Sequence, residues 1–180
     1  SMTDDPDNKF VIDESRMLLL TDNASASASL PQGNKISVDG FMYQITGENT
    51  VSLSFSGPTG NNYSGHITIP STISAQGKTY NVTRIGHNAF YNCTSLKSVT
   101  IPSSIIAIDD FAFEGASIEN ITIGEGVRVI GNFAFRNAPN LRSVSLPASL
   151  LSMGESVFEG CSNLLDVICL DKSPSSIPES

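Results

Sequence analysis

Apolar residues in the second half of the chain recur in register every 22 or 23 positions. The first copy begins at residue 85, and further copies begin at residues 108, 130 and 153. A fixed period in this range is typical of a solenoid, in which one supersecondary unit stacks on the next. We therefore expect function to lie on an extended surface and not in a closed pocket.

Each copy predicts one short strand, because two apolar residues alternate with polar residues at the same place in every copy. One strand per copy, added in parallel, predicts a continuous sheet along the solenoid. The second copy is one residue short at 116–118, which we expect to tighten only that corner. A phenylalanine recurs in register and predicts a buried stack of rings at Phe90, Phe113, Phe135 and Phe158.

Residues 35–56 have a different pattern, in which apolar and polar residues alternate around two turns. The first turn, Asp39-Gly40, is typical of a two-residue hairpin. We predict a three-stranded meander that caps the first coil, since the end of a stack otherwise exposes its core. The first coil is expected to start at Ile67, to be interrupted by the insertion AQGKTYN and to resume at Val82.

These patterns predict four parts of the chain. Residues 1–34 are expected to form a tether or a small hairpin, followed by an Ala/Ser linker. Residues 35–66 are the meander cap and a loop, and residues 67–172 are the repeats. Residues 173–180 are expected to be a truncated tail that resembles the start of a further coil.

The repeat also resembles that of a known family. The string IGHNAFYNCTSLKSVTIPSSI at residues 85–105 is similar to the repeat of BspA-like leucine-rich repeat proteins of Bacteroidetes. The segments VDGFMYQI and IPSTISAQGKTYNVTRIGHNAF are similar to N-terminal segments of such proteins. The resemblance implies a surface or secreted protein that binds host or microbial surfaces, without implying a particular ligand. Together with the patterns above, it predicts a leucine-rich repeat solenoid with a parallel β-sheet and an irregular convex side, capped by an N-terminal β-meander.

Charge and hydropathy narrow the range of partners. Ten Lys+Arg stand against 18 Asp+Glu, for a formal net charge of −8. This argues against nucleic acid, which is bound by clustered cations. The longest apolar run, Met17–Leu20, is too short to span a bilayer, so we expect no membrane insertion. We expect a monomer or a weak end-to-end dimer, located outside the cell or at its surface.

No motif for catalysis, metal binding or cofactor binding is legible, so we expect no enzyme, no metal and no cofactor. The string QGKTY lacks the first glycine of a phosphate-binding loop, because Thr72 stands there. His66 and His87 are expected on the surface, and Asp109-Asp110 is expected to be a solvated turn. Phe111 and Phe133 precede the Ala-Phe pairs of adjacent copies, and we expect them to pack against the neighbouring turn.

The three cysteines are expected to be inert. Cys93 and Cys161 occupy the same repeat position three coils apart, or roughly 14 Å at ~4.8 Å per coil, which is beyond the reach of a disulfide. Ala116 and Ala138 occupy that position in the two middle copies, so we expect small buried thiols there. Cys169 occupies an apolar strand position and is expected in the core.

The polar residues of the predicted strands should share the outer face of the sheet. They are small and lack the Trp, Tyr and Arg side chains that usually anchor partners. The face could bind a host or microbial surface protein or a glycan, or it could be an inert solvated sheet. We therefore expect a non-enzymatic binding or adhesion module, with a structural spacer that positions other domains as the alternative. The candidate binding face consists of Thr68, Ser98, Thr100, Asn120, Thr122, Ser143, Ser145 and Asp166.

Overall fold

The structure is a computed structural model that describes residues 34–56 and 63–170. The chain divides into two compact units, residues 1–34 and residues 35–180. Apart from Asn34, all the described residues belong to the second unit. The tether or hairpin expected before residue 34 and the tail expected at 173–180 lie outside the described residues.

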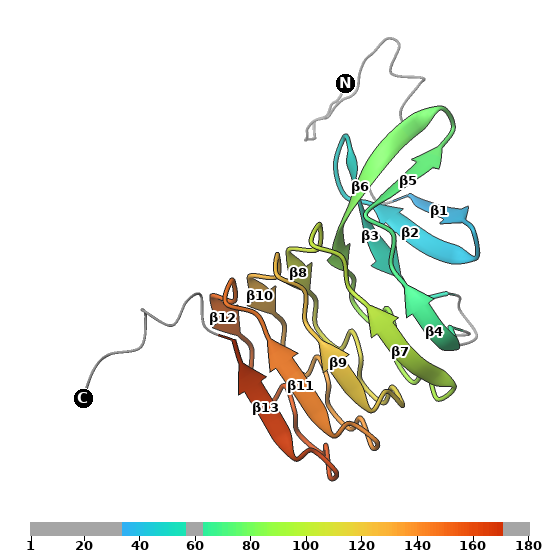
Figure 1. The fold of residues 1–180 in the computed structure, drawn as a ribbon. Coiled ribbons are helices and arrows are strands. Elements are labelled where there is room, and N and C mark those ends of the chain that lie inside the picture. The colour runs from blue at the N-terminus through green and yellow to red at the C-terminus, as the bar shows by residue number, and fades with distance from the viewer. Residues whose placement is uncertain (1–33, 57–62, 171–180) are drawn as a thin grey trace, which may run out of the picture. The chain divides into compact units, whose positions relative to one another are not determined.

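Three antiparallel strands form the predicted meander, β1 (Lys35–Val38), β2 (Phe41–Ile45) and β3 (Thr50–Ser54). Asp39 and Gly40 join the first two strands with φ values of 50° and 85°. A type I′ hairpin turn needs positive φ at both central residues, which is why Asp-Gly suits it. The meander buries one apolar face, and the predicted cap is confirmed (Figure 1).

The first coil differs from the expectation in two ways. Its strand β4 (Gly65–Thr68) begins two residues before Ile67, inside the segment expected to be a loop. The insertion after it is a β-hairpin, made by β5 (Thr72–Ala75) and β6 (Lys78–Ile85). Strand β6 also pairs in parallel with β3, so the inserted hairpin is what joins the meander to the repeats.

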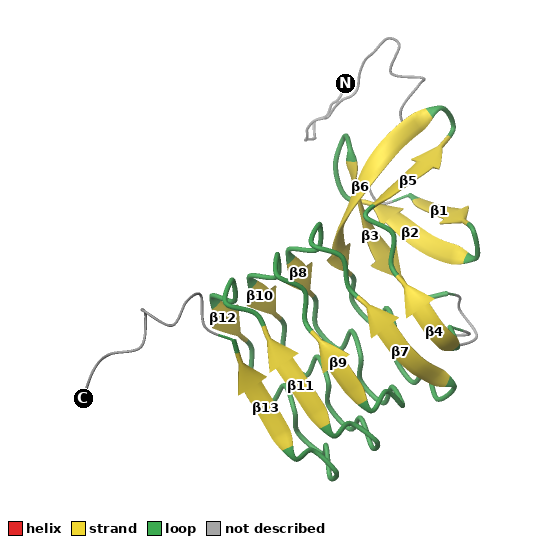
Figure 2. Ribbon diagram, viewed as in Figure 1, coloured by secondary structure: helices red, strands yellow, loops and turns green. Residues whose placement is uncertain are grey.

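Each later coil contributes a strand to two sides of the solenoid (Figure 2). One side carries β7 (Leu96–Thr100), β9 (Asn120–Thr122), β11 (Ser143–Leu146) and β13 (Asp166–Cys169). The side that we expected to be irregular carries the two-residue strands β8 (Ala107–Ile108), β10 (Val129–Ile130) and β12 (Ser152–Met153). These short strands continue the sheet of the meander in the order β1-β2-β3-β6-β8-β10-β12. No helix occurs in residues 34–56 or 63–170.

The predicted stack of phenyl rings is confirmed. Successive ring centroids are 5.0 Å apart for Phe90 and Phe113, 4.9 Å for Phe113 and Phe135, and 5.7 Å for Phe135 and Phe158. Tyr63 extends the stack toward the meander, with its ring centroid 5.4 Å from that of Phe90. The Tyr63 hydroxyl donates a hydrogen bond to the Ser54 carbonyl oxygen at 2.8 Å. The stack therefore spans the repeats and ends on the cap.

The long strands do not form the continuous sheet that we predicted. Strand β4 pairs with β7, and β9 pairs with β11 and β13, but no ladder joins β7 to β9. The break coincides with the missing residue of the second copy. Phe90 stacks on Phe113, 23 residues later, whereas Ala107 pairs with Val129, 22 residues later. The offset changes where β7 and β9 lie, and a parallel ladder needs evenly spaced partners along its length. The missing residue therefore affects more than one corner.

The cysteines occupy three environments. Cys93 is buried, Cys161 is partly buried and Cys169 is exposed, and all three are free thiols. The expected core position of Cys169 was wrong. Although Cys169 pairs in register with Leu146, β13 has a partner on one side only within the described residues. A position that is buried in an inner coil is therefore uncovered in this one.

Candidate binding face

The eight residues of the candidate binding face lie on the side of the strands that points away from the core. The buried residues beside them, such as Val99, Ile121 and Val144, are at most 6% exposed. The predicted in-and-out phase of the strands therefore agrees with the structure. The exposed members are Thr68, Thr100, Asn120, Thr122 and Asp166, and the partly buried members are Ser98, Ser143 and Ser145.

Strand pairing aligns these side chains in short rows. Thr68 lies opposite Thr100 across β4 and β7. On the other side of the break, Ser143 lies between Asn120 and Asp166, and Ser145 lies between Thr122 and Ile168. The rows place one small polar group of each coil beside that of the next.

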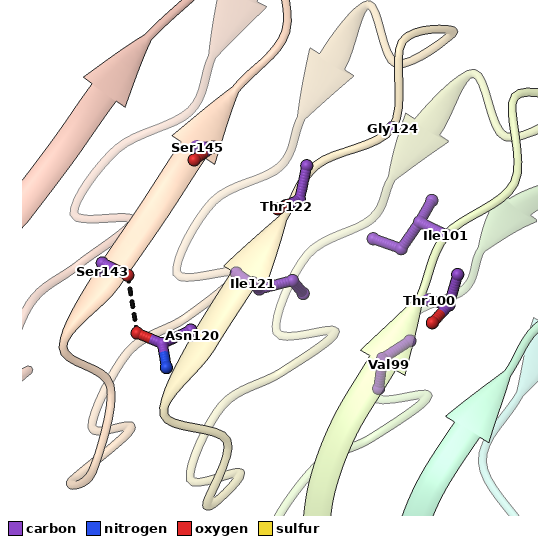
Figure 3. Close-up of a pocket in the computed structure, with 9 residues that line it drawn as sticks. All are labelled: Val99, Thr100, Ile101, Asn120, Ile121, Thr122, Gly124, Ser143 and Ser145. Carbon is purple, nitrogen blue, oxygen red and sulfur yellow. Dashed lines mark hydrogen bonds between the residues drawn. The ribbon is translucent and has the colours of Figure 1, made fainter.

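Two hydrogen bonds fix side chains within these rows. The Ser143 hydroxyl donates to Asn120 Oδ1 at 2.6 Å (Figure 3). Ser98 Oγ and His66 Nδ1 are 2.8 Å apart. A serine beside a histidine would need a third group that orients the ring to become an activated nucleophile, and no carboxylate bonds to His66 among the residues that the structure describes. This pair therefore gives the face no catalytic arrangement.

A pocket of about 330 Å³ lies where the ladder between β7 and β9 is missing. Both neighbouring coils supply its walls, and none of the lining side chains carries a charge. Figure 3 shows the pocket between the two strands, with the side chains of both. It is lined by Val99, Thr100, Ile101, Asn120, Ile121, Thr122, Gly124, Ser143 and Ser145.

The coils approach each other again on either side of this pocket. At one end, the Ser117 hydroxyl donates to the Leu96 carbonyl oxygen at 2.7 Å. At the other end, a Cβ on Gly124 would lie 3.0 Å from the Ile101 carbonyl oxygen, so glycine permits the close approach. The opening is thus local. We call the pocket together with the unpaired edges of β7 and β9 the seam.

A second pocket, of about 510 Å³, borders the seam at Asn120. Its lining includes Lys97, Glu119 and His66, so this neighbour carries charged and titratable groups that the seam lacks. In the described parts of the chain, no group of three or more His, Cys, Asp or Glu side chains could hold a metal ion. Likewise, none of the described residues forms a helix that could cross a membrane.

An aromatic pair lies elsewhere on the coils. Phe111 and Phe133 stack with centroids 5.2 Å apart, and the guanidinium of Arg136 lies 4.8 Å from the Phe133 centroid. Both phenylalanines have left-handed backbones, with φ of 60° and 58°. Asn88 and Ser156 occupy the same repeat position with the same sign of φ, and such conformations are costly for bulky residues. The rings pack on each other between adjacent coils.

Comparison with known proteins now places the chain. A family model described as the BspA type leucine rich repeat region matches residues 66–180 in six copies. The chain belongs to the BspA-type leucine-rich repeat family. The strands of the binding face, from β7 to β13, fall within the matched residues, and so does the seam.

Solved structures show the same fold as this BspA-type chain. A leucine-rich repeat protein from Bacteroides capillosus is 26% identical with a TM-score of 0.64, and the match covers 76% of this chain and 98% of that one. One from Bacteroides ovatus is 26% identical with a TM-score of 0.41, over 73% of this chain and 46% of that one. The T. pallidum leucine-rich repeat protein is 18% identical with a TM-score of 0.51, over 77% and 84%. No curated protein matches the chain.

Sequence reasoning identified the exposed rows but missed the seam. The signal was present, because the second copy is visibly one residue short. What the pattern did not reveal is that the shortening removes a whole ladder and opens a pocket within the face.

Proposed function

We propose that this BspA-type domain is a non-enzymatic binding module that recognises surface macromolecules of host or microbial cells. It acts outside the cell or at its surface, as the resemblance to BspA-like proteins implies. The contact is made by the binding face, with the seam near its middle. The observation that carries the proposal is the alignment of exposed polar side chains on adjacent coils around a pocket.

The chemistry of the face supports weak contacts that are repeated over an area. Hydroxyl and amide groups each contribute a modest net hydrogen bond, about 0.5–1.5 kcal/mol. The face carries no Trp, Tyr or Arg, the side chains that supply most binding energy at compact protein interfaces. Binding through this face therefore gains strength when several domains or several ligand copies engage at once.

The test is a binding screen against matrix proteins, mucins and whole bacteria, followed by Thr122→Arg in any pair that binds. Thr122 is exposed and lines the seam, so the long cation should block the face with little effect on the fold. Val129→Arg is the matched control, because Val129 is 42% exposed on β10, on the other side of the coil. We expect the first change to abolish binding, the second to preserve it, and both melting temperatures to stay within a few degrees of the parent.

Each other outcome has a definite meaning. A silent screen would favour the structural spacer over the binding module. Unchanged affinity in Thr122→Arg would move the site away from the binding face. A large loss of stability in Thr122→Arg would show that the side chain is needed for packing.

A further inference from the structure

The seam differs from every other junction between the long strands of neighbouring coils. Strand β7 has a ladder partner only at β4, and β9 has one only at β11. No backbone hydrogen bond joins β7 to β9 within the described residues. An edge strand presents a row of backbone N–H and C=O groups to whatever lies beside it. Two such edges therefore face each other across the pocket.

The width of the seam decides what kind of ligand it can take. A peptide strand inserted between two others needs about 9.6 Å, twice the spacing of neighbouring strands. Some Cα atoms of β7 and β9 are within 8 Å of each other, so a strand does not fit without parting the coils. The pocket volume, about 330 Å³, lies at the lower end of the range for small-molecule sites. The seam therefore suits a compact polar group.

The groups that line the seam both donate and accept hydrogen bonds. Thr100, Thr122 and Ser145 contribute hydroxyls, and each hydroxyl can do either. Asn120 accepts from Ser143 through its Oδ1, which leaves its Nδ2 amide as a donor beside the pocket (Figure 3). The pocket lining contains no charged side chain, so it does not select for an ion.

An apolar floor lies beneath these polar groups. Val99, Ile101 and Ile121 line the pocket and remain 4–8% exposed. A ligand that fits both layers carries hydroxyls at its edge and C–H groups on its face. A pyranose ring has this combination.

We propose that the seam binds a neutral saccharide unit, such as one sugar of a surface glycan. This inference rests on the proposed binding function and names the ligand class of its site. Hydroxyls of the sugar satisfy the backbone edges of β7 and β9, and its C–H face covers Val99, Ile101 and Ile121. The missing residue in the second copy is what creates the site, because a full-length coil would pair β7 with β9.

The test uses NMR titration of the ¹⁵N-labelled protein with neutral trisaccharides at millimolar concentration, namely maltotriose, cellotriose and triacetylchitotriose. We expect at least one sugar to shift amide signals within residues 99–101 and 120–122. Thr122→Arg should weaken that binding at least tenfold. Thr68→Arg is the matched control, because Thr68 is exposed on the same face but does not line the seam. It should leave the shifts unchanged.

A second variant tests the origin of the site. One threonine inserted between Ala116 and Ser117 restores the length of the other copies and should form the missing ladder. We expect the amides at 120–122 to become more protected from hydrogen exchange and the sugar-induced shifts to disappear. Retained sugar binding alongside a formed ladder would overturn the proposal. If the inserted chain does not fold, the Thr122→Arg and Thr68→Arg pair still decides the outcome.

Failure of this inference is distinguishable from failure of the binding function. If no trisaccharide shifts the seam amides while a macromolecule still binds and is blocked by Thr122→Arg, the saccharide class is wrong and the binding module stands. If both experiments are silent, both proposals fall. Shifts that survive Thr122→Arg place the sugar outside the seam and also overturn the inference.

Discussion

Phe113 and Phe135 lie in adjacent coils with ring centroids 4.9 Å apart and ring planes within 4° of parallel. Phe90 covers the other face of Phe113 at 5.0 Å, and Phe113 has no exposed surface. One aromatic ring in each coil thus forms a continuous column through the core. Such a column links the stability of each coil to that of its neighbours.

Truncation of Phe113 to Ala should be among the costliest single changes in the repeats. A buried phenyl ring lost from a packed core typically costs about 3–5 kcal/mol. Phe111→Ala is the matched comparison, because Phe111 is only partly buried and has a left-handed backbone. We expect it to cost less than half as much in denaturant unfolding. Similar losses for the two variants would contradict the assignment of Phe113 to the main column.

The buried thiol of Cys93 should make stability fall at alkaline pH. Burial raises the pKa of Cys93 from its ordinary value of 9.0 to about 12. The fold therefore favours the neutral thiol, and this contribution is fully present below about pH 9 and is lost as pH rises toward about 12. Ala116 and Ala138 occupy the equivalent position in other coils, so Cys93→Ala is a conservative change.

The measurement is the melting temperature of parent and variants between pH 8 and pH 11, where ionisation of free thiols and phenols begins. We expect a shallower decline in Cys93→Ala than in the parent. Cys169→Ala should follow the parent curve, because Cys169 is exposed. Part of the decline should persist in every variant, since burial also raises the pKa of Tyr63 to about 12. Parallel curves for parent and Cys93→Ala would exclude a contribution from this thiol.

The ion pair between Arg136 and Glu114 should stabilise the fold because Glu114 is nearly buried. The Arg136 guanidinium lies 2.6 Å from Glu114 Oε2, and the Glu114 side chain is 10% exposed. Arg136→Met would leave this carboxylate without its cation, which we expect to cost about 2–3 kcal/mol. Glu114→Gln in the same chain should recover part of the loss.

Arg136 provides its own control through a second acidic partner. Glu159 lies 3.9 Å from Arg136 and is 57% exposed. Exposed pairs contribute little, so Glu159→Gln should change stability by less than about 0.5 kcal/mol. A double-mutant cycle separates the ion pair from the contact between Arg136 and Phe133. A coupling energy near zero for Arg136 and Glu114 would show that packing alone explains the loss.

The meander should be needed for solubility. A chain that begins at Gly65 lacks the β3 partner of β6 and the Tyr63 ring that covers Phe90. We expect it to aggregate, as an uncapped end of a solenoid does. A chain that begins at Lys35 retains the meander and should stay soluble. Light scattering and thermal melting compare the two, and a soluble, cooperatively melting chain from Gly65 would show that the meander is dispensable.

Local patterns were enough to predict much of this fold. The period of the repeats, the phenyl column, the strand phase of the binding face and the meander all follow from the spacing of apolar residues and from turn chemistry. Each depends on residues that are close in sequence or related by a fixed repeat. Thr100, Thr122 and Ser145 could therefore be assigned to one outer face before any contact between coils was known.

Other features were decided only by the tertiary structure, because they depend on contacts between segments that no pattern relates. Tyr63 stands in a segment that reads as a loop, yet it ends the aromatic column because β2 and β3 place hydrogen-bonding partners around its hydroxyl. Cys169 has the repeat position of a core residue but is exposed, because burial there requires a neighbouring coil on both sides. The seam between β7 and β9 is the third case. One absent residue was visible in the sequence, but whether it shortens a turn or removes a ladder depends on how two coils pack in space.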